Sequence, residues 1–139
     1  MYSISKKINI IKPAFILKNI FRNDEIGSSA VIKFTCCDCN HENTIEITPY
    51  QSGFPILQIY KENTVLSKNE LLKNRMVSET SQGMLHFGEV TVDNLPTLYF
   101  GTTCSYCHSK YMGVFGYGET QPGLTTLVIS GIWKYEESV

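Results

Sequence analysis

Residues 34–43 read FTCCDCNHEN, which places three cysteines and a histidine within six positions. One Cys-x-x-Cys pair lies in this stretch, and a second lies in TTCSYCH at 102–108. A two-residue gap lets one tight turn point both sulfurs at a common centre, with backbone N–H groups donating to the thiolates. Two such turns complete a tetrahedron. The sequence therefore predicts one structural Zn²⁺ per chain, with the ligands Cys36, Cys39, Cys104 and Cys107.

Strand-like segments flank both pairs. AVIKFT at 30–35 alternates in polarity and leads into the first pair, and TIEIT at 44–48 follows it. TLYFG at 97–101 leads into the second pair, and YMGVFGY at 111–117 follows that one. Each pair is therefore expected between two strands, the first at the tip of a hairpin.

This placement resembles the zinc knuckle of zinc-ribbon proteins, over KFTCCDCN and FGTTCSYCH only. A ribbon usually separates its knuckles by about 15 to 20 residues, whereas 64 residues lie between Cys39 and Cys104 here. The usual proline and glycine are missing too, although Asn40 can take the left-handed conformation of a glycine. We interpret the site as an interrupted zinc ribbon. A rubredoxin-like iron site would use the same four ligands.

Three other residues compete for the ligand roles. The turn should direct Cys37 away from the metal, and a full set of cysteines leaves His41 and His108 as surface or outer residues. A thioredoxin-type redox site is the alternative use of such a pair. It needs a helix after the first cysteine, and no helical pattern follows either pair.

The remaining chain predicts an α+β fold: an antiparallel sheet ending in a β-meander, with two helices. One helix is expected from Pro13 to about Arg22, since proline suits a first helical position and apolar residues follow. It is expected to pack on the sheet, and a membrane-surface helix is the alternative. The second helix is expected at 67–79, because Ser67 and Glu70 have capping-box spacing. Further strands are expected at 7–11, 55–60, 84–92 and 125–135.

Length and charge bound the organisation. We expect 139 residues to form one zinc-binding domain, 1–139, with 1–26 as a basic helical segment packed on it. Residues 1–22 carry five basic side chains and no acid, whereas the remaining chain carries seven basic and thirteen acidic ones. No stretch has the roughly 18 apolar residues of a membrane helix. No signal-peptide pattern is visible, and the paired cysteines fit a reducing compartment, so we expect a cytoplasmic protein.

No catalytic constellation is visible in the sequence. A catalytic zinc keeps an open position, and four cysteines leave none. The remaining histidine, His86, is expected in a strand near Glu89, with one face on the core. We therefore expect a protein that is not an enzyme.

A rigid, metal-clipped domain without catalytic groups is typical of a protein-binding module. The leading hypothesis is a protein that binds a partner protein, in the manner of bacterial immunity or antitoxin-like inhibitors; this is an analogy of type, without a motif. The composition, rich in Lys, Asn and Ile, is typical of an AT-rich bacterial genome. The alternative is a zinc-ribbon protein that binds nucleic acid, with Tyr106 and Tyr111 available for stacking. The acidic body disfavours that alternative.

Overall fold

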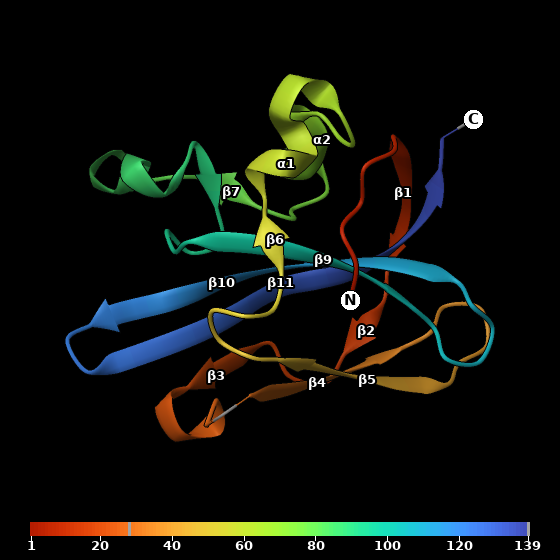
Figure 1. The fold of residues 1–139 in the computed structure, drawn as a ribbon, viewed down its shortest axis with the longest axis horizontal. Coiled ribbons are helices and arrows are strands. Elements are labelled where there is room, and N and C mark those ends of the chain that lie inside the picture. The colour runs from red at the N-terminus through yellow and green to blue at the C-terminus, as the bar shows by residue number, and fades with distance from the viewer. Residues whose placement is uncertain (28, 139) are drawn as a thin grey trace.

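Two antiparallel sheets lie one above the other in the computed structural model, which describes residues 1–27 and 29–138 (Figure 1). The larger sheet has the order β1-β11-β10-β9-β6, with β3 also paired to β11, and the smaller has the order β2-β4-β5. A two-stranded ribbon, β7-β8, lies apart. The strands are β1 (Ile8–Pro13), β2 (Phe15–Ile16), β3 (Ile20–Arg22), β4 (Ala30–Thr35), β5 (Glu42–Ile47), β6 (Phe54–Pro55), β7 (Ser78–Glu79), β8 (Val90–Thr91), β9 (Thr97–Thr103), β10 (Lys110–Gln121) and β11 (Leu124–Glu137).

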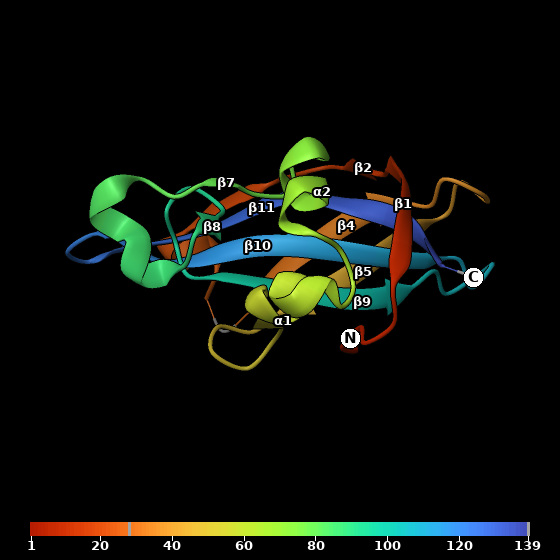
Figure 2. The same ribbon diagram turned by 90° about the horizontal axis from the view of Figure 1, so that it is seen from above.

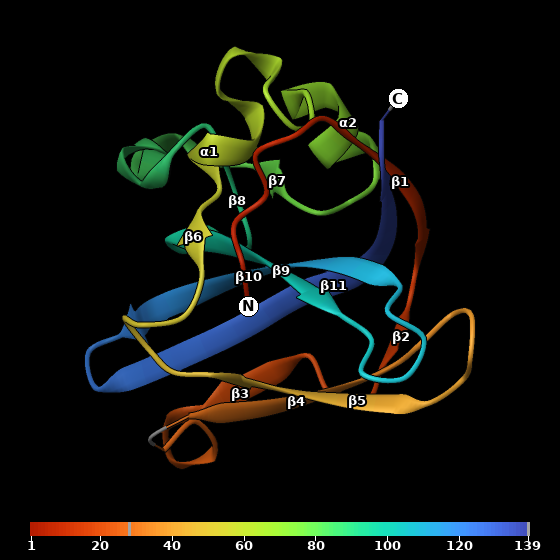
Figure 3. The same cartoon turned by 45° about the vertical axis from the view of Figure 1, so that its right-hand side comes forward.

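Short helices cover the other face of the larger sheet. Figures 1 and 3 show α1 and α2 above the sheet and the smaller sheet below it, and Figure 2 shows α1 over β9. The larger sheet is therefore the middle layer. The helices on this face are α1 (Leu57–Tyr60), α2 (Lys68–Lys73) and the 3-10 turns η2 (Lys61–Asn63) and η3 (Gln82–Phe87). The 3-10 turn η1 (Asn23–Glu25) follows β3 and lies on the side of the smaller sheet.

Alternation along the middle strands divides the core into two parts. On β10, Met112 and Val114 face the helices, whereas Tyr111 and Phe115 face the smaller sheet. Successive side chains of a strand point to opposite faces, so one strand contributes to both cores. The smaller sheet is buried on one face only, as its alternating burial shows on both β4 and β5. This is the α+β, mostly antiparallel fold that the sequence predicts.

The N-terminal segment corrects one prediction. Residues 13–22 form no helix; they continue β1, pass into β2 on the smaller sheet and return to the larger sheet as β3. Phe15 and Leu17 are 67% and 68% exposed, whereas Phe21 is buried. An apolar run of this length fits either a helix or strands. Pairing with β4 and β11, which lie far along the chain, decides in favour of strands.

Two further segments differ from their predicted structure. The stretch 55–60 ends its strand at Pro55 and becomes α1, and 84–92 begins as η3 before the short strand β8. The predicted helix at 67–79 is α2, which has the expected capping box of Ser67 and Glu70 but ends at Lys73. Arg75 has a φ of 58°, which a helix does not accommodate. The predicted strands 30–35 and 97–101 and the closing β-meander are confirmed.

Across residues 1–27 and 29–138, the helices are all too short, or too polar, to cross a bilayer.

Candidate metal centre

The tips of two hairpins meet at one end of the molecule. The turn between β4 and β5 carries the first Cys-x-x-Cys pair, and the turn between β9 and β10 carries the second (Figures 1 and 3). One hairpin belongs to the smaller sheet and the other to the larger sheet. The predicted site therefore lies where the two sheets come together, and a metal there would join them.

The four predicted ligands are brought together. The Sγ atoms of Cys36, Cys39, Cys104 and Cys107 all lie within 4.8 Å of one another. Cys36 Sγ lies 3.4 Å from Cys107 Sγ, and Cys39 Sγ lies 3.6 Å from Cys104 Sγ. Tetrahedral zinc with bonds of about 2.3 Å separates its sulfurs by roughly 3.8 Å. The cluster therefore has the size of a four-sulfur metal site.

The two turns have the same backbone geometry. The N–H of Cys36 donates to the His41 carbonyl at 3.0 Å, and the N–H of Asn40 donates to the Cys36 carbonyl at 3.1 Å. In the second turn Cys104 has the corresponding bonds, at 2.9 Å to Ser109 and 3.0 Å from His108. The last turn residues, Asn40 and His108, both have positive φ, at 62° and 65°. Local hydrogen bonding in the turns thus places each pair of sulfurs.

Each hairpin also supplies a side chain to the opposite turn. From β5, the amide nitrogen of Asn43 donates to Cys104 Sγ at 3.3 Å, and its oxygen accepts from the Ser105 N–H at 2.9 Å. From β10, the hydroxyl of Tyr111 donates to Cys36 Sγ at 3.1 Å and accepts from the Cys37 N–H at 2.7 Å. Asn43 and Tyr111 each lie four residues after the second cysteine of their own pair. The centre therefore has an approximate two-fold symmetry.

Ionisation of the thiols is strongly uneven. Burial raises the pKa of Cys36, but the hydrogen bonds from Tyr111 and from backbone N–H groups outweigh it and lower this pKa to about 6. Burial raises the pKa of Cys104 too, but hydrogen bonds from backbone N–H groups and from Asn43 outweigh it, so this pKa is also lowered. A backbone bond lowers the pKa of Cys39, yet burial and the other thiols together raise it to about 12. Four adjacent thiolates repel one another, so a cation is required for all of them to ionise.

The competing residues lie outside the sulfur cluster. Cys37 is half-buried and its Sγ lies 3.7 Å from the Pro13 carbonyl, away from the other sulfurs. His108 is exposed. His41 is exposed as well, and its ring stacks on Tyr106 with centroids 3.9 Å apart. Contrary to prediction, His86 lies in η3 and is exposed, so it has no core-facing side.

Neither pair has the setting of a redox dithiol. Strands follow both turns, β5 after the first and β10 after the second. No helix N-terminus among the described residues therefore supports either first cysteine, which agrees with the sequence prediction.

The groups that contact the sulfurs were not predicted. Sequence reasoning considered Tyr111 only as a stacking residue and did not consider Asn43 or Ser109, whose Oγ lies 3.2 Å from Cys107 Sγ. One signal was available: Asn43 and Tyr111 occupy matching positions after their pairs. That match becomes meaningful only once the two hairpins face each other.

Comparisons with protein-family models, with curated proteins and with solved structures find no match for this chain.

Proposed function

We propose that this protein is a non-enzymatic protein-binding domain held together by one structural Zn²⁺. The clustering of four sulfurs between two sheets supports this proposal most directly. Four thiolates fill a tetrahedral zinc and leave no position for water or substrate. The metal would stabilise the fold, and Asn43 and Tyr111 would orient the sulfurs and offset their charge.

The metal assignment is tested by native mass spectrometry. We expect one zinc per chain, lost when Cys104 is changed to serine and retained when Cys37 is changed to serine. The two substitutions are chemically identical, so they separate a ligand from its neighbour. Iron in the wild-type protein would correct the metal, whereas a protein that carries no metal and is unaffected by chelator would overturn the site.

The outer face of the smaller sheet is the proposed binding surface. Its apolar residues are Phe15, Leu17 and Val31, which are exposed by 67%, 68% and 46%. The register places Phe15 beside Thr35, and the Leu17 N–H donates to the Lys33 carbonyl, so these side chains share one face. Exposed apolar residues grouped on one face are typical of an interaction surface.

Charge indicates the kind of partner. Glu42 and Glu46 are exposed on β5; within residues 1–27 and 29–138, Glu42 forms an ion pair, with Lys33 at 3.8 Å, and Glu46 forms none. A partner protein with an apolar centre and a basic rim would complement this face. An inhibitor of the immunity or antitoxin type would use such a surface to cover its target, an assignment that remains an analogy.

The binding test uses matched leucines. A partner that forms a complex of fixed stoichiometry should be lost with Leu17→Asp and kept with Leu57→Asp, since Leu57 is also exposed but lies in α1 above the larger sheet. Equal loss with both variants, or with neither, would contradict this surface. The zinc measurement is independent, so the metal and the binding surface can fail separately.

Nucleic-acid binding is the second candidate. One observation favours it: the exposed Tyr106 ring stacks on His41 beside the cluster and could extend to a base. The charges near the cluster disfavour it. Lys110 and Lys134 are already paired with Glu137 and Asp38, each at 2.8 Å, so their charges are neutralised and are not free to contact phosphates. Retention on single-stranded DNA that falls with salt, and that Tyr106→Ala weakens, would support this candidate.

A further inference from the structure

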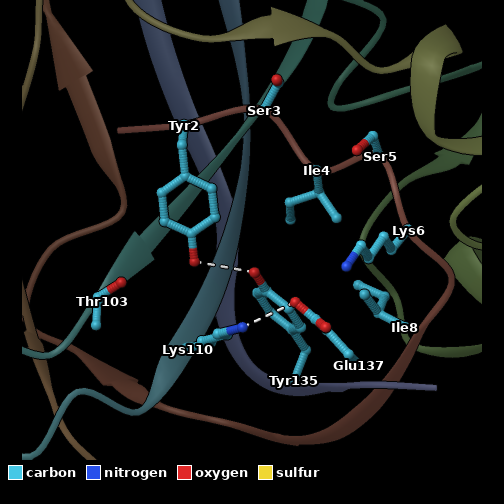
Figure 4. Close-up of a pocket in the computed structure, with 10 residues that line it drawn as sticks. All are labelled: Tyr2, Ser3, Ile4, Ser5, Lys6, Ile8, Thr103, Lys110, Tyr135 and Glu137. Carbon is cyan, nitrogen blue, oxygen red and sulfur yellow. Dashed lines mark hydrogen bonds and ion pairs between the residues drawn. The ribbon is translucent and has the colours of Figure 1, made fainter. Parts of the chain in front are cut away.

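The cavities of the described residues differ in chemistry. Figure 4 shows the one beside the N-terminus, about 340 Å³, where the Tyr2 and Tyr135 hydroxyls meet at 2.9 Å and Lys110 pairs with Glu137. Another, of about 170 Å³, lies between the two sheets and has no Lys, Arg, His, Asp or Glu in its lining. Of these two cavities, the smaller therefore has an uncharged lining and the larger a charged one.

The uncharged cavity lies away from the metal centre. It is bounded by Ile47 at the end of β5, by the turn that follows, and by residues of β9, β10 and β11. Since β5 begins next to the first cysteine turn, the cavity lies toward the opposite end of the space between the sheets. Its floor is formed by fully buried side chains: Ile47, Phe115 and Leu127. These apolar side chains offer no hydrogen bonds to water, so an apolar ligand can replace water against this floor.

An aromatic residue stands at the mouth. Tyr50, in the turn after β5, lines the cavity and is 89% exposed. The Tyr50 and Tyr117 rings make a T-shaped contact, with centroids 5.2 Å apart and planes at 83°. Packing therefore covers only a small part of a large apolar ring, and burial does not explain its position.

Tyr50 also has an unfavourable backbone. Its φ is 66°, which bulky side chains rarely adopt. Glycine or asparagine would fit this turn at lower cost. Strained residues occur at ligand-binding sites, where the strain holds a side chain in place.

We propose that this cavity, lined by Ile47, Leu98, Phe115, Tyr117 and Leu127 and capped by Tyr50, binds a small uncharged molecule with an aromatic ring. The volume suits one or two fused rings. Thr48, Ser52 and Tyr50 also line the cavity, and their hydroxyls suit one polar group of the ligand. A partner protein's side chain is the less suitable occupant. The proposed protein-binding surface, with Phe15 and Leu17, is the outer face of the smaller sheet, whereas the cavity lies between the two sheets.

The test uses indole as the probe and benzoate as a charged probe of similar size. Titration followed by NMR should give a Kd for indole on the order of 0.1–1 mM, and benzoate should bind at least roughly tenfold more weakly, since no cation lines the cavity. Contacts between indole protons and the methyl groups of Leu98, Leu127 and Ile47 locate the site in the wild-type protein. Indole that does not saturate, or that contacts other methyl groups, overturns the proposal.

Two matched pairs of variants separate the cavity from general effects. Leu98→Phe fills the space and should weaken indole binding at least roughly tenfold, whereas Leu85→Phe, at an exposed leucine of η3, should not. Tyr50→Asn removes the cap and should weaken binding, whereas Arg75→Asn relieves a similar φ of 58° elsewhere and should leave binding unchanged. Unchanged binding in Tyr50→Asn overturns the role of the cap. If no probe binds and Tyr50 is protected only in complex with a partner protein, the cavity accepts a partner's side chain and the proposal is wrong.

Discussion

Asn43 and Tyr111 hold equivalent positions on opposite hairpins and make the same pair of hydrogen bonds across the metal centre. Each donates to the first sulfur of the other turn and accepts from the next backbone N–H. Both side chains are buried. The centre is thus held by four sulfurs and by two cross-linking side chains.

Tyr111→Phe should weaken zinc binding by roughly 10- to 100-fold, because the Cys36 sulfur loses a donor that stabilises its thiolate. Competition with a chromophoric chelator measures the affinity. Tyr106→Phe is the matched control, since the Tyr106 ring stacks on His41 and makes no bond to a sulfur. Equal affinities for the two variants would show that the hydroxyl of Tyr111 has no role in metal binding.

Asn43→Ala should lower the free energy of unfolding by about 1–3 kcal/mol, since it leaves the Ser105 N–H without its acceptor and the Cys104 sulfur without a donor. Urea denaturation of the zinc-loaded protein measures this change. Asn74→Ala, which removes an exposed bond to the Glu70 carbonyl, should cost less. The reverse order would contradict the cross-linking role of Asn43.

Removal of zinc should loosen the two sheets at the end where the hairpin tips meet. Without the metal the four sulfurs have no common centre to bind, so the connection between β4–β5 and β9–β10 is weakened. Hydrogen exchange after chelation should therefore rise first in residues 34–43 and 102–111, while α2 provides an internal reference. Uniform acceleration along the chain would instead indicate global unfolding.

Gly113→Ala should destabilise the fold by about 1–3 kcal/mol through overpacking. Gly113 lies on β10 opposite Phe100, and an added Cβ would overlap the buried Phe100 ring. Gly83→Ala in η3 meets no atom within 4 Å and should change stability by less than about 1 kcal/mol. Thermal denaturation of the two variants compares their losses of stability. Equal losses would show that the strands shift to accommodate the methyl group at Gly113.

The exposed pair Lys68–Glu89 should make only a small, pH-dependent contribution. A hydrogen bond from Lys68, at 2.8 Å, lowers the pKa of Glu89 below its ordinary value of 4.5. A carboxyl group with a lowered pKa stabilises the fold above that ordinary value and loses this effect as the pH falls through the lowered one. The Tm difference between wild type and Glu89→Gln should therefore be larger at neutral pH than at about pH 3. A Tm difference between wild type and Glu89→Gln that is larger in acid than at neutral pH would contradict this prediction.

The sequence by itself determined the features that depend on neighbouring residues. Alternation predicted β4 and the closing β-meander, and capping-box spacing predicted the start of α2 at Ser67. The Cys-x-x-Cys spacing identified the four sulfurs that cluster, because the turn that directs each pair is local. These patterns need no information about distant strands.

Tertiary structure decided what depends on distant contacts. The apolar residues 13–22 suit a helix by local preference, but pairing with β4 and β11 makes them strands. His86 was expected on a strand because its neighbours alternate, yet the segment turns outward as η3. The partners of the sulfurs, Asn43 and Tyr111, became recognisable only when two hairpins distant in the sequence met at their tips; Asn43 lies 62 positions before Ser105, from whose N–H it accepts a hydrogen bond. Local sequence fixes turns and strand periodicity, whereas the choice of pairing partner depends on which distant surfaces bury one another.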